Sequence, residues 1–214
     1  RQLDREERFS YDTMRKMAEL GLFGIFVSEK YGGQGMDYLS YIIATEEIAR
    51  VDGSHAATVA AENSLGIGPI YYFGSEAQKK KYLPALCRGE GLWGFGLTEA
   101  NAGSDAVASR TTAVLDGNQW VINGSKIFIT NASTDISLGS TVMCRTGTRE
   151  DGKPELSCIL VEAGTPGYTT REMHGKMMWR ASNTSELYFE DCRVPQENLV
   201  GPRGEGFKQM MKTL

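Results

Sequence analysis

The chain has 214 residues, of which 41% are hydrophobic and 23% are charged, and its formal net charge is −4. This length and composition predict a soluble globular protein of one large or two small domains, with enough apolar residues for a real core. The acidic balance argues against a nucleic-acid or anionic-membrane partner, and no apolar run approaches the ~20 residues that a membrane-spanning helix needs.

The first eight residues are highly charged and have neither an initiator Met nor the apolar core of a signal peptide. We therefore expect a helix that is entered midway in a trimmed sequence. The two histidines, His55 and His174, stand apart from any metal-ligand spacing, so we expect no metal site. The cysteines lack the short spacing of zinc or thioredoxin motifs, and we expect buried, reduced thiols at Cys87, Cys144, Cys158 and Cys192.

Residues before about 90 have a helical periodicity. Met14, Met17 and Leu20 recur at three-residue spacing and stop at Gly21, a residue that readily ends a helix. Asp37 can cap a second helix, which we expect to run to residue 50. The apolar positions of that helix are predicted to face the core; they are Leu39, Ile42, Ile43 and Ile48.

Two more helices are predicted before the apolar periodicity changes near residue 90. The third covers residues 56–66 and resumes after Gly68-Pro69. The fourth begins at residues 75–78, which have the spacing of a capping box, and runs towards Cys87 with a disturbance at Pro84. The lysines at 79–81 are expected on the exposed face of this last helix. Together these elements predict an α-helical domain.

After residue 90 the apolar period drops towards two, which predicts strands. Residues 111–115 and 120–122 flank a turn at Asp116-Gly117-Asn118, and Asn123-Gly124 is expected to turn the chain again into residues 126–130. Further strands are predicted at residues 142–145, 156–162, 168–171 and 186–189, followed by a linker at 201–206 and the start of a helix at 207–214. The fold class is therefore α+β, with a helical domain followed by an antiparallel β-barrel-like domain.

Residues 95–105 form an apolar strand that runs into a turn rich in small and hydroxyl-bearing side chains. Such a turn exposes backbone N–H groups and short donors that can bind anionic or carbonyl oxygens. The Gly94-Phe95-Gly96 opening lacks the third glycine and the βαβ pattern of a dinucleotide fingerprint. Taken alone, the hydroxyls of this turn can be simple turn formers, and residues 128–130 can be an ordinary strand end.

Residues 95–105 nevertheless closely resemble the signature of the acyl-CoA dehydrogenases, flavoenzymes that oxidise the Cα–Cβ bond of a thioester. Residues 22–24 with 31–33, 73–84 and 186–195 resemble other family segments in the same order. Several spaced matches in register are more specific than one motif. The resemblance implies a helical domain at 1–89, a β domain at 90–201, and at 202–214 only a linker and the first turns of a C-terminal helical domain.

The resemblance also implies an FAD cofactor. Thr98 would hydrogen-bond the pyrimidine edge of the flavin, and the Gly103–Ser104 turn would contribute to FAD binding. Phe128 would cover one face of the isoalloxazine, although many members carry Trp there, and Thr130 would donate towards N5. The expected cofactor-binding residues are Phe95, Leu97, Thr98, Gly103, Ser104, Phe128, Ile129 and Thr130, and Ser104 would also approach the acyl-CoA thioester.

In this family a base takes a proton from Cα while a hydride leaves Cβ for flavin N5, which gives a trans-2-enoyl-CoA. The base is a glutamate of the C-terminal domain, beyond Leu214, so we name no catalytic residue and expect the 214-residue chain alone to be inactive. Glu99 belongs by resemblance to the FAD-binding loop. The resemblance further implies a homotetramer, electron transfer to an electron-transferring flavoprotein, and a place in the bacterial cytoplasm or mitochondrial matrix.

Two alternatives stay open from the sequence. Acyl-CoA oxidases and related monooxygenases reuse the same scaffold, and a shortened chain can be a non-catalytic flavin- or CoA-binding module. The sequence does not predict the acyl-chain length, because one methylene changes discrimination by only ~1–3 kcal/mol. Away from these motifs, Met177-Met178-Trp179 is predicted to pack in the core and residues 180–184 to position the sheet edge near the cofactor.

Overall fold

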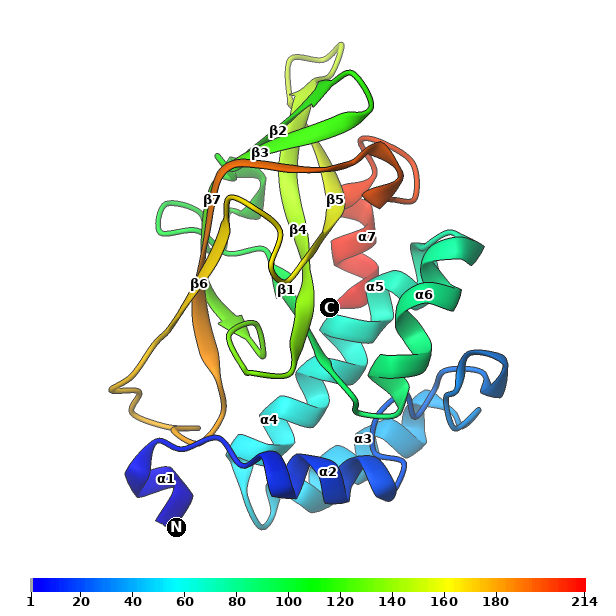
Figure 1. Ribbon diagram of the computed structural model, residues 1–214, viewed down its shortest axis with the longest axis vertical. Coiled ribbons are helices and arrows are strands. Elements are labelled where there is room, and N and C mark those ends of the chain that lie inside the picture. Colours follow the sequence, from blue (N-terminus) through cyan, green and yellow to red (C-terminus); the bar gives the residue numbers. More distant parts are fainter. Residues whose placement is uncertain (1) are drawn as a thin grey trace.

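The computed structural model describes residues 2–214. A helical region is followed by an eight-stranded, mostly antiparallel sheet, and a last helix packs between the two (Figure 1). The helices are α1 (Gln2–Glu6), α2 (Tyr11–Glu19), α3 (Tyr38–Ala49), α4 (Gly53–Ala61), α5 (Gly68–Phe73), α6 (Glu76–Cys87) and α7 (Gly206–Thr213). The strands are β1 (Leu92–Gly96), β2 (Thr112–Asp116), β3 (Gln119–Thr130), β4 (Ser137–Thr148), β5 (Pro154–Glu162), β6 (Tyr168–Glu172), β7 (Thr184–Pro195) and β8 (Leu199–Val200). The predicted α+β order is confirmed.

The helix boundaries follow local capping chemistry. Asp37 accepts a hydrogen bond from the Ser40 amide at the start of α3, and Ser75 with Gln78 forms a complete capping box on α6. The predicted interruption of the third helix is wrong, because residues 53–73 run on through a π-helical segment, η2 (Glu62–Ile67). Pro69 lies at the first turn of α5, where a missing N–H is tolerated.

The predicted core-facing stripe of α3 is wrong at three of its four positions, and only Ile48 is partly buried against a core cluster. Leu39, Ile42 and Ile43 are exposed, whereas Tyr41 is buried and donates its hydroxyl to the Ala60 carbonyl at 3.1 Å. Apolar residues occupy more than one side of this helix, so the periodicity alone did not identify the side that packs on α4. The side chosen by the fold is the one that carries the tyrosine.

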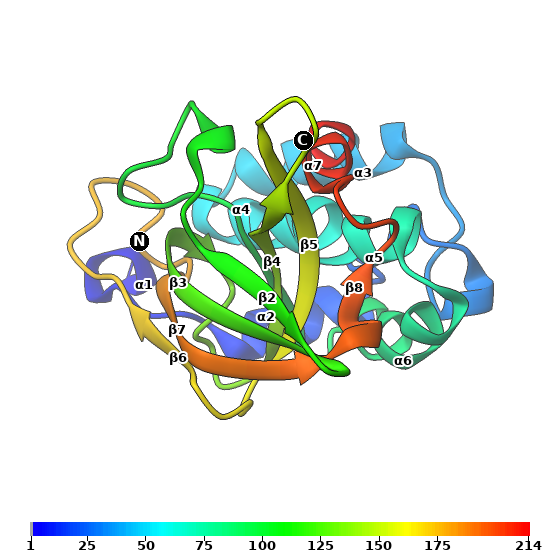
Figure 2. The same ribbon diagram turned by 90° about the horizontal axis from the view of Figure 1, so that it is seen from above.

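The strands form one sheet in the order β6-β7-β3-β2-β4-β5-β8, and β1 pairs in parallel with β4. The sheet is strongly curved when seen from above (Figure 2). Side chains from β2 to β7 gather in a core of its own, which includes Trp120, Ile122, Ile159 and Phe189. The sheet therefore curls around its own hydrophobic side, as the barrel-like prediction requires.

The second predicted turn, at Asn123-Gly124, is wrong. β3 continues through these residues as one strand of 12, with an irregularity in its pairing to β7. Gly124 has φ +141°, and a Cβ at this position would lie 2.7 Å from the Thr111 Cα. The glycine is needed for a close approach between two backbones, not for a turn.

A second core joins the helices to the sheet. It contains Ile67 and Leu83 from the helical region together with Trp93, Met143 and Leu160 from the strands. The predicted linker at 201–206 is held against this body, because Arg203 donates to Glu155 Oε1 and to the Thr146 carbonyl, both at 2.6 Å. The four cysteines are free and buried, as predicted.

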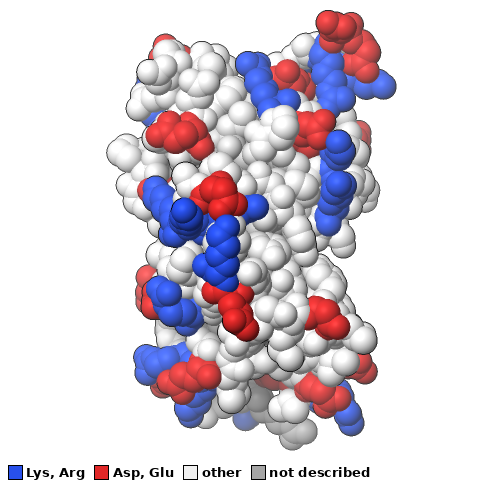
Figure 3. All heavy atoms as spheres, turned by 90° about the vertical axis from the view of Figure 1, so that its right-hand side faces the viewer, with Lys and Arg blue, Asp and Glu red and all other residues white. Residues whose placement is uncertain are grey.

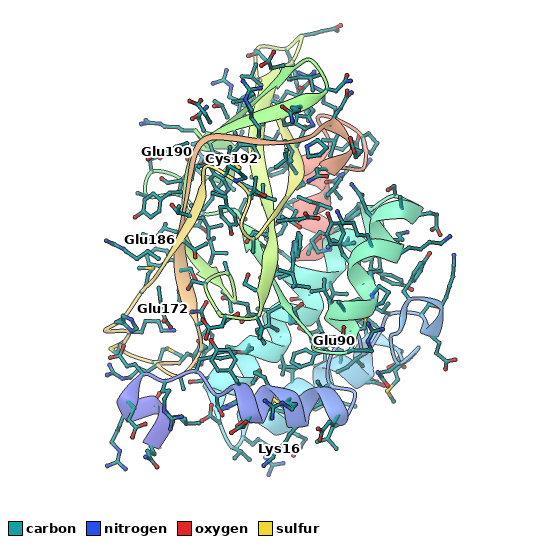
Figure 4. All side chains as sticks on the ribbon, viewed as in Figure 1. Lys16, Glu90, Glu172, Glu186, Glu190 and Cys192 are labelled. Carbon is teal, nitrogen blue, oxygen red and sulfur yellow. The ribbon has the colours of Figure 1, made fainter. Side chains whose placement is uncertain are left out.

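Charged residues follow the outer edge of the sheet. Glu172, Glu186 and Glu190 line β6 and β7, with Cys192 farther along β7 (Figure 4). Arg171 of the edge strand pairs with Glu186 at 2.7 Å. Charges on an edge strand discourage pairing with another sheet.

On the side shown in Figure 3, Lys and Arg are interspersed with Asp and Glu, and neither sign forms a large continuous patch.

The loop between β6 and β7 differs from its prediction. Met177, Met178 and Trp179 are 95%, 57% and 50% exposed, so the predicted core packing is wrong. The loop is instead fixed through its polar neighbours, because Arg180 pairs with Glu7 and donates from Nε to the Asp4 carbonyl at 3.1 Å. In the described part of the chain, no helix is both long and apolar enough to cross a membrane.

Candidate functional site

The two segments singled out in the sequence meet at one end of the sheet. β1 ends at Gly96, whose missing side chain leaves room for Lys126; a Cβ there would lie 3.2 Å from the lysine Cγ. The chain then turns alongside β3, and the Thr98 carbonyl accepts a hydrogen bond from the Ile127 amide at 2.9 Å. This bond places the strand-and-turn motif next to residues 128–130.

Phe128 has an unusual backbone and an exposed side chain. Its φ is +64°, in the left-handed region that bulky residues avoid, and its side chain is 61% exposed. The pairing of β3 with β7 shifts register between Lys126 and Ile129, so Phe128 lies on a β-bulge. Strain and bulges of this kind concentrate at functional sites, where they aim a side chain outwards.

The other predicted site residues divide into a buried floor and an exposed rim. Phe95 and Ile129 are buried, and Leu97, Thr98 and Thr130 are partly buried. Gly103 and Ser104 are exposed, and a Cβ added at Gly103 would meet no atom within 4 Å. Packing therefore does not explain the glycine. The rim residues are free to contact a ligand that approaches the turn.

A buried ion pair lies beneath this turn. Lys126 Nζ is 2.8 Å from Glu99 Oε1, and the two side chains are 0% and 4% exposed. Burial alone would raise the pKa of Glu99, but hydrogen bonds from Lys126, Ser109 and the Arg110 amide outweigh it and lower that pKa to about 2. A carboxylate of this pKa is a weak base, which agrees with the assignment of Glu99 to the loop and not to proton abstraction.

A second buried carboxyl lies beside Asn131, the residue that follows β3. Glu62 of η2 is fully buried and accepts from the Trp93 amide at 2.9 Å and from Asn131 Nδ2 at 3.4 Å. The two hydrogen bonds lower its pKa, but burial outweighs them and raises the pKa to about 8. Its Oε1 and the Asn131 Oδ1 have no hydrogen-bond partner among the described residues. At neutral pH this side chain is therefore mostly a neutral acid.

Sequence reasoning missed Lys126, Glu62 and Asn131. Two of them carried a signal that could have been used. Lys126 occupies an inward position of β3 in register with Trp120 and Ile122, and Glu62 interrupts a run of small and apolar residues on one helix. A charged residue at a position that the period assigns to the core is an informative exception. Asn131 carried no such signal.

The geometry fits a planar aromatic cofactor at the end of β3. Phe128 offers an exposed aromatic face, and the hydroxyl-bearing Thr98 and Thr130 lie on the two segments that the Thr98–Ile127 bond joins. The exposed Gly103–Ser104 turn adds N–H groups that an anionic group can accept from. Among the described residues, no group of three or more His, Cys, Asp or Glu side chains could hold a metal ion.

Comparisons with known proteins identify the family of this chain. Residues 1–90 match the family model "Acyl-CoA dehydrogenase, N-terminal domain", and residues 94–192 match the model "Acyl-CoA dehydrogenase, middle domain". The chain is 44% identical over 213 residues to the short-chain specific acyl-CoA dehydrogenase of Clostridium acetobutylicum, covering 100% of this chain and 55% of the relative. The chain thus spans about half the length of the curated relatives it matches.

Solved structures have the same fold. A glutaryl-CoA dehydrogenase from Mycobacterium smegmatis, in complex with FADH2, matches with a TM-score of 0.90 and 31% identity over 99% of this chain and 52% of that one. A chain from the structure of the electron transferring flavoprotein of Acidaminococcus fermentans matches with a TM-score of 0.91 and 44% identity, covering 98% of this chain and 54% of that one. Two adjacent family matches, a close relative and two superposable structures lead to one conclusion: the chain belongs to the acyl-CoA dehydrogenase family.

Proposed function

We propose that this protein is an FAD-dependent acyl-CoA dehydrogenase that forms a trans-2-enoyl-CoA. The observation that carries the proposal is Phe128, an exposed aromatic in a strained backbone on a β-bulge, beside the Thr98–Ile127 hydrogen bond. Bound FAD would supply the acceptor for the hydride that leaves Cβ. The relative named for short-chain specificity makes a short, straight acyl-CoA the first substrate to test.

The residues of the site have distinct proposed roles. Phe128 would cover one face of the flavin ring, Thr98 would bond its pyrimidine edge, and Thr130 would donate towards N5. Ser104 would lie near both FAD and the thioester. Fixed donors around a ring that gains charge lower the cost of that charge, because they need no reorientation during the reaction.

No described residue is proposed as the base that removes the α-proton. Glu99 is held by Lys126 and has a pKa of about 2, so it does not suit that role. The proposal for the whole protein follows the family: a homotetramer that passes electrons to an electron-transferring flavoprotein, in a bacterial cytoplasm or mitochondrial matrix. The structural match to a chain from an electron transferring flavoprotein structure supports that partner.

The test uses the complete gene product and two measurements. FAD affinity is measured by quenching of flavin fluorescence, and flavin reduction by a short acyl-CoA is followed anaerobically through the loss of visible absorbance. We expect Phe128→Ala to raise the Kd for FAD by about tenfold or more, since a stacked aromatic is worth ~1–3 kcal/mol when a planar base lies on it. Thr130→Val should slow flavin reduction with a smaller effect on FAD affinity.

A matched control is Thr169→Val, because Thr169 is an exposed strand threonine on the edge strand β6. It should change neither measurement by more than about twofold. The proposal would be overturned if the wild-type protein bound no FAD. It would also be overturned if the Phe128→Ala variant bound FAD as tightly as wild type. Reoxidation of the reduced protein by air instead of an artificial acceptor would point to an oxidase.

A further inference from the structure

Lys126 ties both ends of one loop to the end of β3. Its Nζ donates to the Leu97 carbonyl at 3.1 Å, to Glu99 Oε1 at 2.8 Å and to Ser109 Oγ at 3.1 Å. An ammonium has three donors, so every donor of this fully buried group is used. Leu97 precedes the loop of residues 98–108, and Ser109 follows it.

Glu99 completes the same attachment from inside the loop. Its carboxylate accepts from Ser109 Oγ at 2.6 Å, from the Arg110 amide at 2.7 Å and from the Thr111 amide at 2.9 Å. The pair therefore fixes residue 97 and residues 109–111 to a single point below the sheet end. The residues between them that would meet the flavin, Thr98 and Ser104, are attached through these anchors.

Stability alone is a weak explanation for this pair. Replacing a buried ion pair with apolar side chains of similar size is often neutral or stabilising, because two charges no longer lose their water. Apolar side chains, however, cannot accept from the Arg110 and Thr111 amides or donate to the Leu97 carbonyl. What the pair provides beyond packing is a fixed position for a loop.

We propose that Lys126 and Glu99 are positioning residues that hold Thr98 and the Gly103–Ser104 turn in the arrangement that binds the flavin. The pair touches neither substrate nor cofactor in this proposal, and it acts through the loop. The inference rests on the proposed function, since it presumes that the loop binds FAD. It adds that the Lys126–Glu99 pair affects FAD affinity through the position of the loop, independently of its effect on the stability of the fold.

The experiment compares two variants of the complete gene product. Lys126→Met leaves Glu99 buried without its cation, and the double variant Glu99→Gln/Lys126→Met removes both charges. We expect the double variant to recover much of the Tm lost in the single variant, because no unpaired charge remains. FAD affinity should stay low in both variants, with a Kd at least about tenfold above wild type. Both lack Lys126, which bonds the Leu97 carbonyl and Ser109 at the two ends of the loop.

Hydrogen exchange of the flavin-free protein gives a second readout. The Arg110 and Thr111 amides should exchange faster in both variants, because both lack the Lys126 ammonium that holds the accepting Glu99 side chain in place. A control is Gln78→Ala, which removes a buried polar side chain on α6 and should lower Tm while leaving the Kd for FAD within about twofold of wild type.

The outcomes separate this inference from the proposed function. If FAD affinity returns together with Tm in the double variant, the pair has only a structural role and the inference is wrong. If Lys126→Met binds FAD like wild type, the inference is also wrong while the proposed function stands. If the wild-type protein binds no FAD, the proposed function fails, whatever the exchange data show.

Discussion

Two buried glutamates illustrate how the surroundings of a residue decide its charge. Glu99 is paired with Lys126, and that bond together with those from Ser109 and the Arg110 amide holds its pKa at about 2 despite burial. In the described part of the chain, Glu62 has no cation among its hydrogen-bond partners, and burial raises its pKa to about 8. The same type of side chain is therefore an anion beside Lys126 and mostly a neutral acid beside Asn131.

Glu62 makes folding stability depend on pH. Its pKa is raised from 4.5 to about 8 on folding, so between these values the folded protein holds a proton that the unfolded chain has lost. Stability contributed by this proton is complete below the lower value and is lost as pH rises, by up to about 1.4 kcal/mol for each pH unit. Glu62→Gln lacks this dependence.

The check is urea unfolding of wild type and Glu62→Gln at several values between about pH 5 and about pH 9.5. The free energy of unfolding of wild type should fall relative to that of the variant as pH rises, and the difference should level off above about pH 8. Every other ionisable group is present in both proteins, so its contribution cancels in the comparison. A difference that is constant with pH would show that Glu62 is ionised in the folded state.

At the scale of elements, one side chain joins the start of α6 to the last strand of the sheet. Gln78 completes the capping box with Ser75, and its Nε2 also donates to the Glu197 carbonyl at 2.8 Å and to the Leu199 carbonyl at 3.0 Å. The cap is a local feature of the sequence. The two carbonyl bonds cross about 120 residues of chain, and no sequence spacing indicated them.

Substitutions at these two positions should therefore differ in cost. Ser75→Ala loses one capping bond and should lower the free energy of unfolding by ~1 kcal/mol. Gln78→Ala also leaves two carbonyls without their donor, and should cost ~2–3 kcal/mol more. Denaturant unfolding of both variants tests this order, and equal losses would mean that the bonds to β8 and its preceding turn contribute nothing.

At the scale of the whole molecule, the helical region and the sheet are not independent in their packing. One core contains Ile67 and Leu83 together with Trp93 and Leu160, and the π-helical Glu62 bonds the Trp93 amide. The domain division at residues 89 and 201 stays a prediction from sequence texture and resemblance. The shared core means that neither half buries its apolar surface without the other.

We expect the two regions to unfold together. Circular dichroism reports the loss of helix, and fluorescence reports the exposure of the buried Trp93 and Trp120. The two probes should give coincident transitions in denaturant. Residues 1–89 made alone should lack a cooperative transition, because the side chains that face the sheet would be exposed. Separate transitions for the two probes would instead show that the helical region folds by itself.

Local signals predicted much of this structure correctly. The α+β order, the capped starts of α3 and α6, the approximate place of most strands and the buried thiols follow from residue type and period. Residue order also predicted the family, because several motifs recur in register. Of the predicted FAD contacts, Thr98 and residues 128–130 lie on segments that the Thr98–Ile127 bond joins, but their roles stay a proposal.

Only the tertiary structure decided which faces are covered and which charges are paired. Most of the predicted stripe on α3 and the loop at Met177 are exposed, and Asn123-Gly124 continues a strand. Burial and register depend on neighbours distant in sequence. Lys126 and Glu99 are 27 residues apart, yet they form one buried pair beneath the loop. The sequence determined which elements form, since their periods and caps are local, while folding set the positions that give the site its chemistry.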